Sequence, residues 1–129
     1  KNKMNAIAVF GMKETTSELH GKYQAFSQLD FQQKAKGTYK KGLKNGTWYD
    51  YYPGGVIPTI ISNYKNGELH GIFQQFGRRG EPIYEINYKK GLKDGWFIAF
   101  DTNGQEKIRK MFQKGVELQR KQSGDLFSP

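Results

Sequence analysis

The chain has no cysteine, only four prolines and no long apolar segment. The absence of cysteine excludes disulfides, thiolate metal sites and cysteine nucleophiles. The longest apolar run is residues 6–10, far shorter than the ~20 residues that a membrane-spanning helix needs. Only 36% of the residues are hydrophobic, which favours an extended repeat structure, in which each unit packs mainly on its neighbours, over a compact globule.

Glycine is abundant, with 16 residues, and most of it is regularly spaced. Two series recur at steps of 24 or 25 residues, and the first three glycines of the second series each precede a glycine of the first series by four residues. The first series is Gly21, Gly46, Gly71 and Gly95. The second series is Gly42, Gly67, Gly91 and Gly115. A fixed period of this length predicts a tandem array of one small supersecondary unit, and we expect both series to be turn residues.

Aromatic residues recur at fixed offsets from the first series. The residues two positions after these glycines are Tyr23, Trp48, Phe73 and Phe97. The residues five positions after them are Phe26, Tyr51, Phe76 and Phe100. In three of the units a glycine turn then leads into a second run, and the four units close on Tyr39, Tyr64, Tyr88 and Phe112. Each unit is therefore predicted to be a β-hairpin. The fold class is all-β, an elongated antiparallel meander of roughly eight strands.

The spacing also predicts a register and domain limits. Tyr39 and Trp48 are nine residues apart, as are Tyr64 and Phe73, and Tyr88 and Phe97; we expect each pair to lie directly cross-strand. The two aromatic columns are expected on opposite faces, unless a bulge intervenes. Residues 1–18 form an N-terminal cap with an extra strand at 6–10, residues 19–116 the array, and residues 117–129 a C-terminal cap or frayed tail. Helical turns are allowed only at 13–20 and 116–124.

The segments 42–51, 67–76 and 91–100, with a weaker copy at 19–26, resemble MORN repeats. They are most similar to the bacterial variant in the family of YwqK-type antitoxins of toxin–antitoxin systems. The resemblance implies a ribbon of hairpins that binds partners without catalysis, with a role as an antitoxin or immunity protein. In the wider class it implies contact with proteins or with lipid headgroups.

No constellation of residues indicates catalysis, a metal or a cofactor. His20 and His70 both precede a glycine of the first series, where Asn45 and Asp94 stand in the other units. His, Asn and Asp tolerate left-handed backbone, so we interpret these positions as turn chemistry. The carboxylates are scattered, and the glycine-rich stretches lack the phosphate-loop pattern. We expect that the chain is not an enzyme.

The candidate sites are therefore surfaces. The net charge of +9 permits binding to an anionic or acidic partner. Six lysines precede glycines of the second series and would line one edge of the ribbon, where they bind anions or prevent edge-to-edge aggregation. They are Lys40, Lys41, Lys65, Lys89, Lys90 and Lys114. Lys44 and Lys93 are expected to join them. The residues predicted for partner binding are Tyr49, Tyr51, Tyr52, Phe76 and Phe100.

Three functions stay open at this point. The first is a protein-binding module, including an antitoxin that neutralises a toxin whose bound surface is acidic or mixed. The second is an envelope-associated protein that binds anionic lipid through the lysine edge. Nucleic acid is disfavoured, because an aromatic ladder at a structural period is typical of a core. The third function is a scaffold for spacing or self-association, since open end strands allow an edge-to-edge homodimer. The compartment stays open between the cytoplasm and, if a signal peptide has been removed before Lys1, an exported location.

Overall fold

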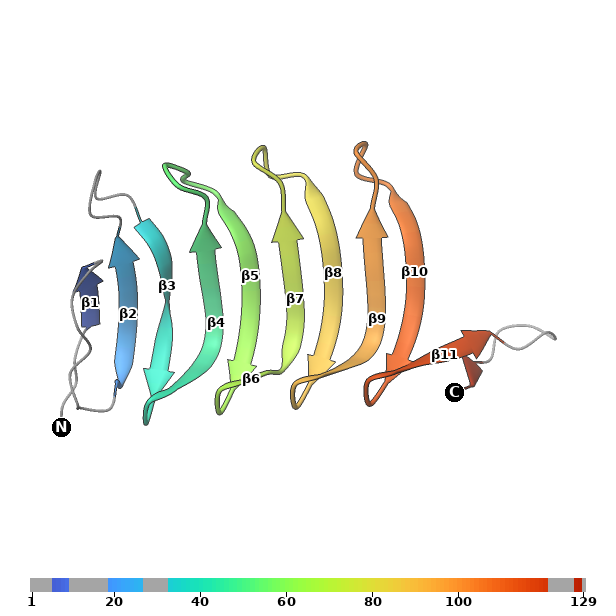
Figure 1. Cartoon of the computed structure of the whole chain (residues 1–129), viewed down its shortest axis with the longest axis horizontal. Helices are drawn as coiled ribbons and strands as arrows, with labels where there is room; N and C mark the ends of the chain where they lie inside the picture. The colour runs from blue at the N-terminus through green and yellow to red at the C-terminus, as the bar shows by residue number, and fades with distance from the viewer. Residues whose placement is uncertain (1–5, 10–18, 27–32, 121–126, 129) are drawn as a thin grey trace.

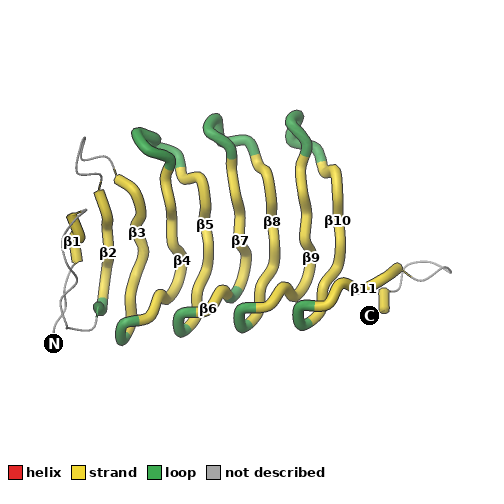
Figure 2. The backbone as a smooth tube through the Cα atoms, in the orientation of Figure 1, coloured by secondary structure: helices red, strands yellow, loops and turns green. Residues whose placement is uncertain are grey.

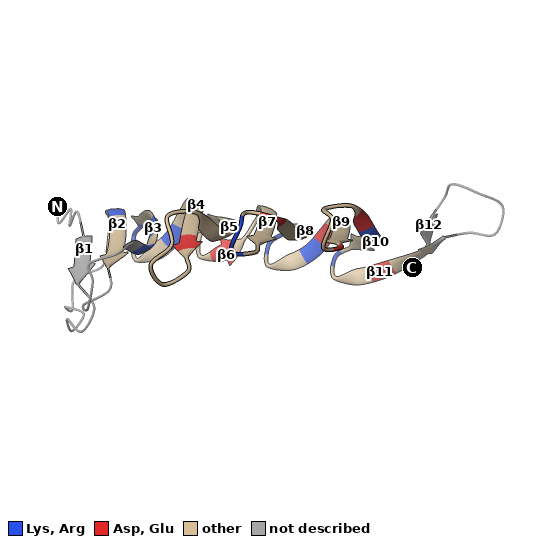
Figure 3. Cartoon of the chain, turned by 90° about the horizontal axis from the view of Figure 1, so that it is seen from above, with Lys and Arg blue, Asp and Glu red and all other residues tan. Residues whose placement is uncertain are grey.

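The computed structural model describes residues 6–9, 19–26, 33–120 and 127–128. Every element within these residues is a strand, and the strands form one open sheet, which confirms the all-β hairpin meander. Figure 1 shows the strands side by side along a ribbon, and Figure 3 shows that the ribbon is one layer thick. The strands are β1 (Ala6–Val9), β2 (Gly21–Phe26), β3 (Gln33–Lys40), β4 (Leu43–Tyr51), β5 (Pro58–Lys65), β6 (Glu68–Leu69), β7 (Gly71–Phe76), β8 (Pro82–Lys89), β9 (Leu92–Phe100), β10 (Glu106–Gln113), β11 (Val116–Arg120) and β12 (Phe127–Ser128).

Four hairpins make up the array, as the period predicts: β2–β3, β4–β5, β7–β8 and β9–β10. The short β6 pairs with β5 just before β7 begins. At the N-terminal end β1 adds to β2 in parallel, within the segment predicted as an extra strand. At the other end residues 116–120 form strand β11 and not a helical turn, because they pair with β10. The other residues for which a helical turn was allowed, 13–18 and 121–124, lie outside the described residues.

The ribbon has two long edges (Figure 2). We call one the turn edge; it holds the tight connections between hairpins, at residues 40–43, 65–68, 89–92 and 113–116. We call the other the tip edge; its described part holds the loops within hairpins, at residues 52–57, 77–81 and 101–105. Along the turn edge both central residues have positive φ, for example 52° at Lys41 and 78° at Gly42. This is the backbone of a two-residue type I′ turn, and the second glycine series supplies its second position without steric cost.

The first glycine series differs from the expectation. Gly21, Gly46, Gly71 and Gly95 lie in strands and not in turns. Each pairs with the aromatic residue of the returning strand: Gly21 with Tyr39, Gly46 with Tyr64, Gly71 with Tyr88 and Gly95 with Phe112. Their φ values of 80° to 112° kink the outgoing strand, and a residue without a side chain leaves room opposite a large ring.

This kink also makes the predicted register wrong. Tyr39 pairs with Lys44, not with Trp48, and Tyr88 pairs with Lys93, not with Phe97. Lys36 pairs with Tyr49 and Thr38 pairs with Asn45. One residue separates the two paired positions in β3, whereas three residues separate them in β4, so β4 bulges. The bulge moves Trp48 to a place over Gly37, where an added Cβ would lie 2.1 Å from the indole.

The kink still brings aromatic rings together on one face. The centroid of Trp48 lies 5.0 Å from that of Tyr39 and 5.5 Å from that of Tyr23. Further along the ribbon Phe73 contacts Tyr88, and Phe97 contacts Phe112. The ladder therefore exists, but it is built from diagonal neighbours and not from directly paired residues.

The core is small because the sheet has no second layer. Among the described residues the buried hydrophobic side chains are Trp48, Ile86, Ile98 and Ala99, and one polar residue, Ser62, is buried opposite Trp48. Ile98 and Ala99 are adjacent in a strand and so point to opposite faces. Each face of the ribbon therefore has its own shallow core, and most aromatic side chains are only half-buried.

Candidate interaction surfaces

Within the described residues no three His, Asp or Glu side chains gather as a metal site would require. Over the same part of the chain no helix has the length and apolarity to cross a membrane. The two histidines are held apart by their contacts with different turns.

His20 and His70 bind the turn of the following unit. The Nδ1 atom of His20 accepts a hydrogen bond from the backbone N–H of Lys41 at 3.1 Å, and that of His70 accepts from Lys90 at 3.2 Å. In the last unit a carboxylate oxygen of Asp94 accepts from Lys114 in the same way. The positive φ belongs to the donor residues, Lys41, Lys90 and Lys114, and not to the histidines. The prediction of turn or left-handed backbone at these positions is therefore wrong for the histidines, which accept hydrogen bonds from a turn without being part of one.

A backbone hydrogen bond repeats beside each of these contacts. The N–H of each second-series glycine donates to a carbonyl one unit earlier: Gly42 to Leu19, Gly67 to Lys44, Gly91 to Leu69 and Gly115 to Lys93, at 2.7–2.9 Å. Each turn is thus tied to the preceding unit through one or two N–H groups. This ladder of turns links successive units along the turn edge.

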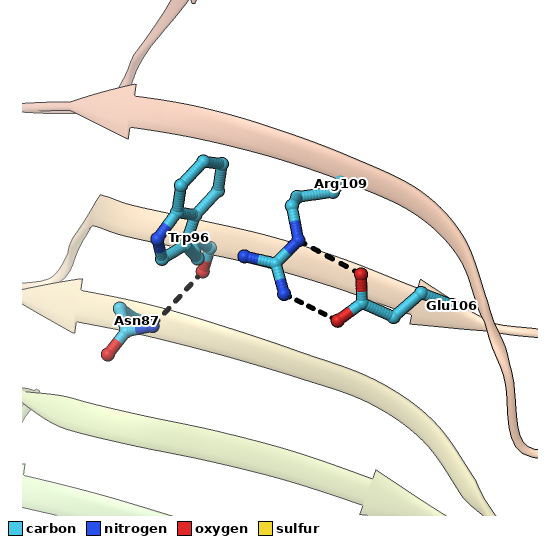
Figure 4. Close-up of polar contacts among 4 residues, drawn as sticks. All are labelled: Asn87, Trp96, Glu106 and Arg109. Carbon is cyan, nitrogen blue, oxygen red and sulfur yellow. Dashed lines mark hydrogen bonds and ion pairs between the residues drawn. The ribbon is translucent and has the colours of Figure 1, made fainter. Parts of the chain in front are cut away.

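Asn63 and Asn87 form a second repeated contact that we did not predict. The side-chain amide of Asn63 donates to the carbonyl of Ile72 at 2.8 Å, and that of Asn87 donates to the carbonyl of Trp96 at 3.2 Å (Figure 4). Both carbonyls follow a glycine of the first series, where the kink breaks the regular strand pairing. The amides therefore satisfy a carbonyl at the kink. Their recurrence one residue before Tyr64 and Tyr88 was visible in the sequence.

The six lysines of the predicted anion-binding edge lie where expected. They are Lys40, Lys41, Lys65, Lys89, Lys90 and Lys114, and all six are exposed on the turn edge. Within the described residues none of them forms an ion pair with a carboxylate. Exposed leucines at residues 43 and 92 lie between them, and Glu68 takes the same place in the intervening turn.

Lys44 and Lys93 have a different role. The Nζ atom of Lys44 lies 4.6 Å from the ring centre of Trp48 and 5.1 Å from that of Tyr64. Lys93 lies 5.0 Å from the rings of both Phe97 and Phe112. These lysines cover the aromatic ladder and take the place of a missing second layer, since their long stems shield rings while the ammonium stays wet.

The opposite face uses the same device. Lys36 lies over Tyr49 at 5.3 Å, and the guanidinium of Arg109 lies 4.7 Å from the ring centre of Trp96. Figure 4 shows Arg109 between Trp96 and Glu106. The Nε atom of Arg109 donates to Glu106 at 2.9 Å, and this hydrogen bond, with the positive charge, lowers the pKa of Glu106. Cations thus cover aromatic rings on both faces of the ribbon.

Burial perturbs two further groups. Desolvation raises the pKa of Asp50, and the nearby ammonium of Lys44 opposes this shift. Desolvation also raises the pKa of Tyr88, which belongs to the aromatic ladder. Burial on the sheet is thus the largest cause of both shifts.

The residues predicted for partner binding are divided between two places. Tyr49 lies in the middle of β4 beneath Lys36. Tyr51, Phe76 and Phe100 each end an outgoing strand, one per hairpin, near the tip edge. The structure brings together only Tyr52 and Phe76: the hydroxyl of Tyr52 lies 3.5 Å from the carbonyl oxygen of Phe76. All five side chains are half-buried.

The second hairpin carries a hollow at its tip that the sequence analysis did not predict. Residues 52–57 and Arg78 line a shallow pocket of about 290 Å³. The signal for it was available, because Val56 and Ile57 are apolar, β-branched residues directly after a glycine turn. Comparison with known proteins adds nothing to this geometry, since no family model, curated protein or solved structure matches the chain.

Proposed function

We propose that the chain is a non-catalytic protein-binding module, with the antitoxin or immunity role implied by the repeats it resembles. The observation that supports this is the open, one-layer sheet. Among the described residues only Trp48, Ile86, Ile98 and Ala99 are buried hydrophobic side chains, so both faces of the sheet stay accessible to a partner. A standard interface takes ~800 Å² from each partner.

The chemistry of the faces supports a protein partner. Tyrosine, tryptophan and arginine are the side chains that contribute most binding energy at protein interfaces, and one face of the sheet carries all three. The residues Tyr49 and Trp96, each beneath a cation, provide two such anchors on one face. The net charge of +9 favours a partner whose contact surface is acidic or mixed.

In-cell cross-linking of the tagged chain tests the proposal. Cross-linked peptides are mapped by mass spectrometry, and the captured protein is then purified and mixed with the chain at known concentrations. We expect a complex with Kd below about 1 µM. The variant Arg109→Ser weakens it, and the matched control Lys107→Ser, which removes one exposed charge of the same hairpin, leaves it unchanged. Separate elution of the two purified proteins contradicts the proposal.

The lysine edge favours one alternative, binding to an anionic bilayer. Six exposed ammonium groups lie along the turn edge, and each lysine near a charged membrane contributes ~1 kcal/mol. Co-sedimentation with vesicles containing phosphatidylserine, at ~50 mM salt and again at ~500 mM, tests it. Binding that is lost at high salt supports this alternative. The double variant Lys40→Gln with Lys89→Gln should also bind the vesicles more weakly than the matched control. That control, Lys22→Gln with Lys107→Gln, removes the same charge elsewhere on the ribbon. No binding at low salt excludes it.

A further inference from the structure

The tip of the second hairpin differs from the two tips that follow it. The tips of the third and fourth hairpins are polar and closed by their own carboxylates. Glu81 accepts a hydrogen bond from the N–H of Arg79 at 3.0 Å, and Asp101 accepts from the N–H groups of Asn103 and Gln105 at 2.8 and 3.0 Å. Residues 53–57 of the second tip contain no charged or hydroxyl side chain.

Two apolar side chains of this tip face solvent. Val56 is 83% exposed and Ile57 is 45% exposed, and Val56 is the most exposed large hydrophobic residue of the described chain. With Pro53 they form an apolar rim around the pocket of about 290 Å³ defined above by residues 52–57 and Arg78, which we call the tip pocket. Exposed apolar surface around a hollow is typical of a binding site. Without a partner, such a surface favours aggregation.

The tip pocket is held in shape by the third hairpin. The N–H of Gly55 donates to the carbonyl of Tyr52 at 2.8 Å and closes the loop. The hydroxyls of Tyr52 and Thr59 both approach the carbonyl oxygen of Phe76, at 3.5 and 3.2 Å. The guanidinium of Arg78 lies 4.7 Å from the ring centre of Tyr52. A pocket fixed in this way loses little entropy on binding.

The lining sets the chemistry of the occupant. The apolar rim suits an aliphatic side chain, and the volume of about 290 Å³ lies just below the ~300–1,000 Å³ typical of ligand pockets. Arg78 borders the apolar part with a positive charge, and no carboxylate lines the pocket. An arginine presents a planar fork of donors that matches a carboxylate.

We propose that the tip pocket anchors a partner protein through an aliphatic side chain next to a carboxylate. The aliphatic group inserts between Val56 and Ile57, and the neighbouring Asp or Glu binds the guanidinium of Arg78. This inference rests on the proposed protein-binding function and names the part of the partner that the second hairpin recognises.

The test uses a phage-displayed library of random 12-residue peptides, selected on the full chain. We expect enriched peptides to combine Leu, Ile or Val with Asp or Glu. An enriched peptide is then synthesised with a fluorophore and titrated against variants by anisotropy. We expect Val56→Ser with Ile57→Ser, and separately Arg78→Glu, to weaken its binding at least tenfold.

Matched controls change the same chemistry elsewhere. Ile72→Ser removes an exposed aliphatic side chain from β7, and Lys107→Glu reverses an exposed charge on β10; both should keep the affinity within twofold. Urea unfolding midpoints show that the tip variants remain folded, which we expect because Val56 and Ile57 are exposed.

Three outcomes overturn the inference. Enrichment of peptides without acidic residues removes the role of Arg78. Equal binding to wild type and tip variants shows that peptides bind another surface, in which case the protein-binding function stands and only the tip pocket fails. If no peptide is enriched, the tip pocket fails, and the cross-linking experiment decides the wider function independently.

Discussion

Gly37→Ala is the sharpest test of how this one-layer sheet holds its largest side chain. Gly37 lies beneath Trp48, whose side chain is only 2% exposed. A Cβ at position 37 would lie 2.1 Å from Cδ2, 2.3 Å from Cε2 and 2.5 Å from Cγ of the indole. Ordinary contact begins at 3.4 Å, so the ring must move by more than an ångström.

The magnitude follows from what the ring would leave. The indole Nε1 donates to the carbonyl of Thr38 at 3.0 Å, and a typical hydrogen bond contributes about 0.5–1.5 kcal/mol. The ring also contacts Tyr23 and Tyr39, and each aromatic pair adds about 0.5–1.5 kcal/mol beyond its buried area. We therefore expect Gly37→Ala to lower the free energy of unfolding by about 2–4 kcal/mol, close to the 3–5 kcal/mol lost when a buried tryptophan becomes alanine.

Urea unfolding followed by circular dichroism measures this loss. Gly104→Ala is the control for backbone conformation, since Gly104 has φ of 81° and an added Cβ there meets nothing within 4 Å. That variant should lose about 1–2 kcal/mol from left-handed strain alone. Gly37 carries no such strain, so its effect is steric. In a Trp48→Leu background we expect Gly37→Ala to cost less than about 0.5 kcal/mol, because the two residues couple. Additive effects, or a Gly37→Ala loss below about 0.5 kcal/mol, would refute the packing argument.

Three further predictions test the hydrogen bonds and charges. His70→Leu removes the acceptor for the N–H of Lys90 and should lower stability by about 0.5–1.5 kcal/mol in urea unfolding. His70→Asp, which copies the residue of the last unit, should recover most of the loss, and equal losses in both variants contradict the hydrogen-bond role. Lys93→Met keeps the stem but removes the ammonium over Phe97 and Phe112, and should cost about 0.5–1 kcal/mol, against no change for Lys107→Met. Because burial raises the pKa of Asp50 above its ordinary 3.8, the fold disfavours the carboxylate. The contribution of Asp50 to stability is therefore complete below pH 3.8 and is lost as pH rises through the raised value. Asp50→Asn should thus be more stable than wild type at pH 7, and this advantage should vanish in unfolding measured near pH 3.5; a constant difference contradicts the shift.

The glycine period was enough to predict the hairpins, their order and the lysine edge. These features depend on spacing alone, because turn residues and strand lengths recur with it. Trp48 shows where spacing stops being informative. Its register depends on a bulge in β4 next to Gly46. This bulge places the large Trp48 ring over Gly37, a contact between two strands that spacing along the chain does not reveal.

The histidines and asparagines show a different limit. His20, His70 and Asp94 share an ability to accept a hydrogen bond, and their place in the period indicated a turn, but their partner is one unit further along the chain. Asn63 and Asn87 were overlooked although they recur at the period, since amides are common on strands and their acceptor appears only at the kink. The tip pocket depends on contacts between neighbouring hairpins, which periodicity does not report.

The bonds from each turn to the unit before it make the array directional. Each folded unit presents the carbonyl groups that accept hydrogen bonds from the next turn. A further unit can therefore be added on the carboxyl-terminal side without rearranging the units before it. Duplicating residues 67–90 in place would then lengthen the ribbon by one module, about 10 Å at the usual strand spacing, while keeping both edges continuous. Evolution can thus adjust the reach of such a protein in whole steps, leaving the chemistry of its surfaces untouched.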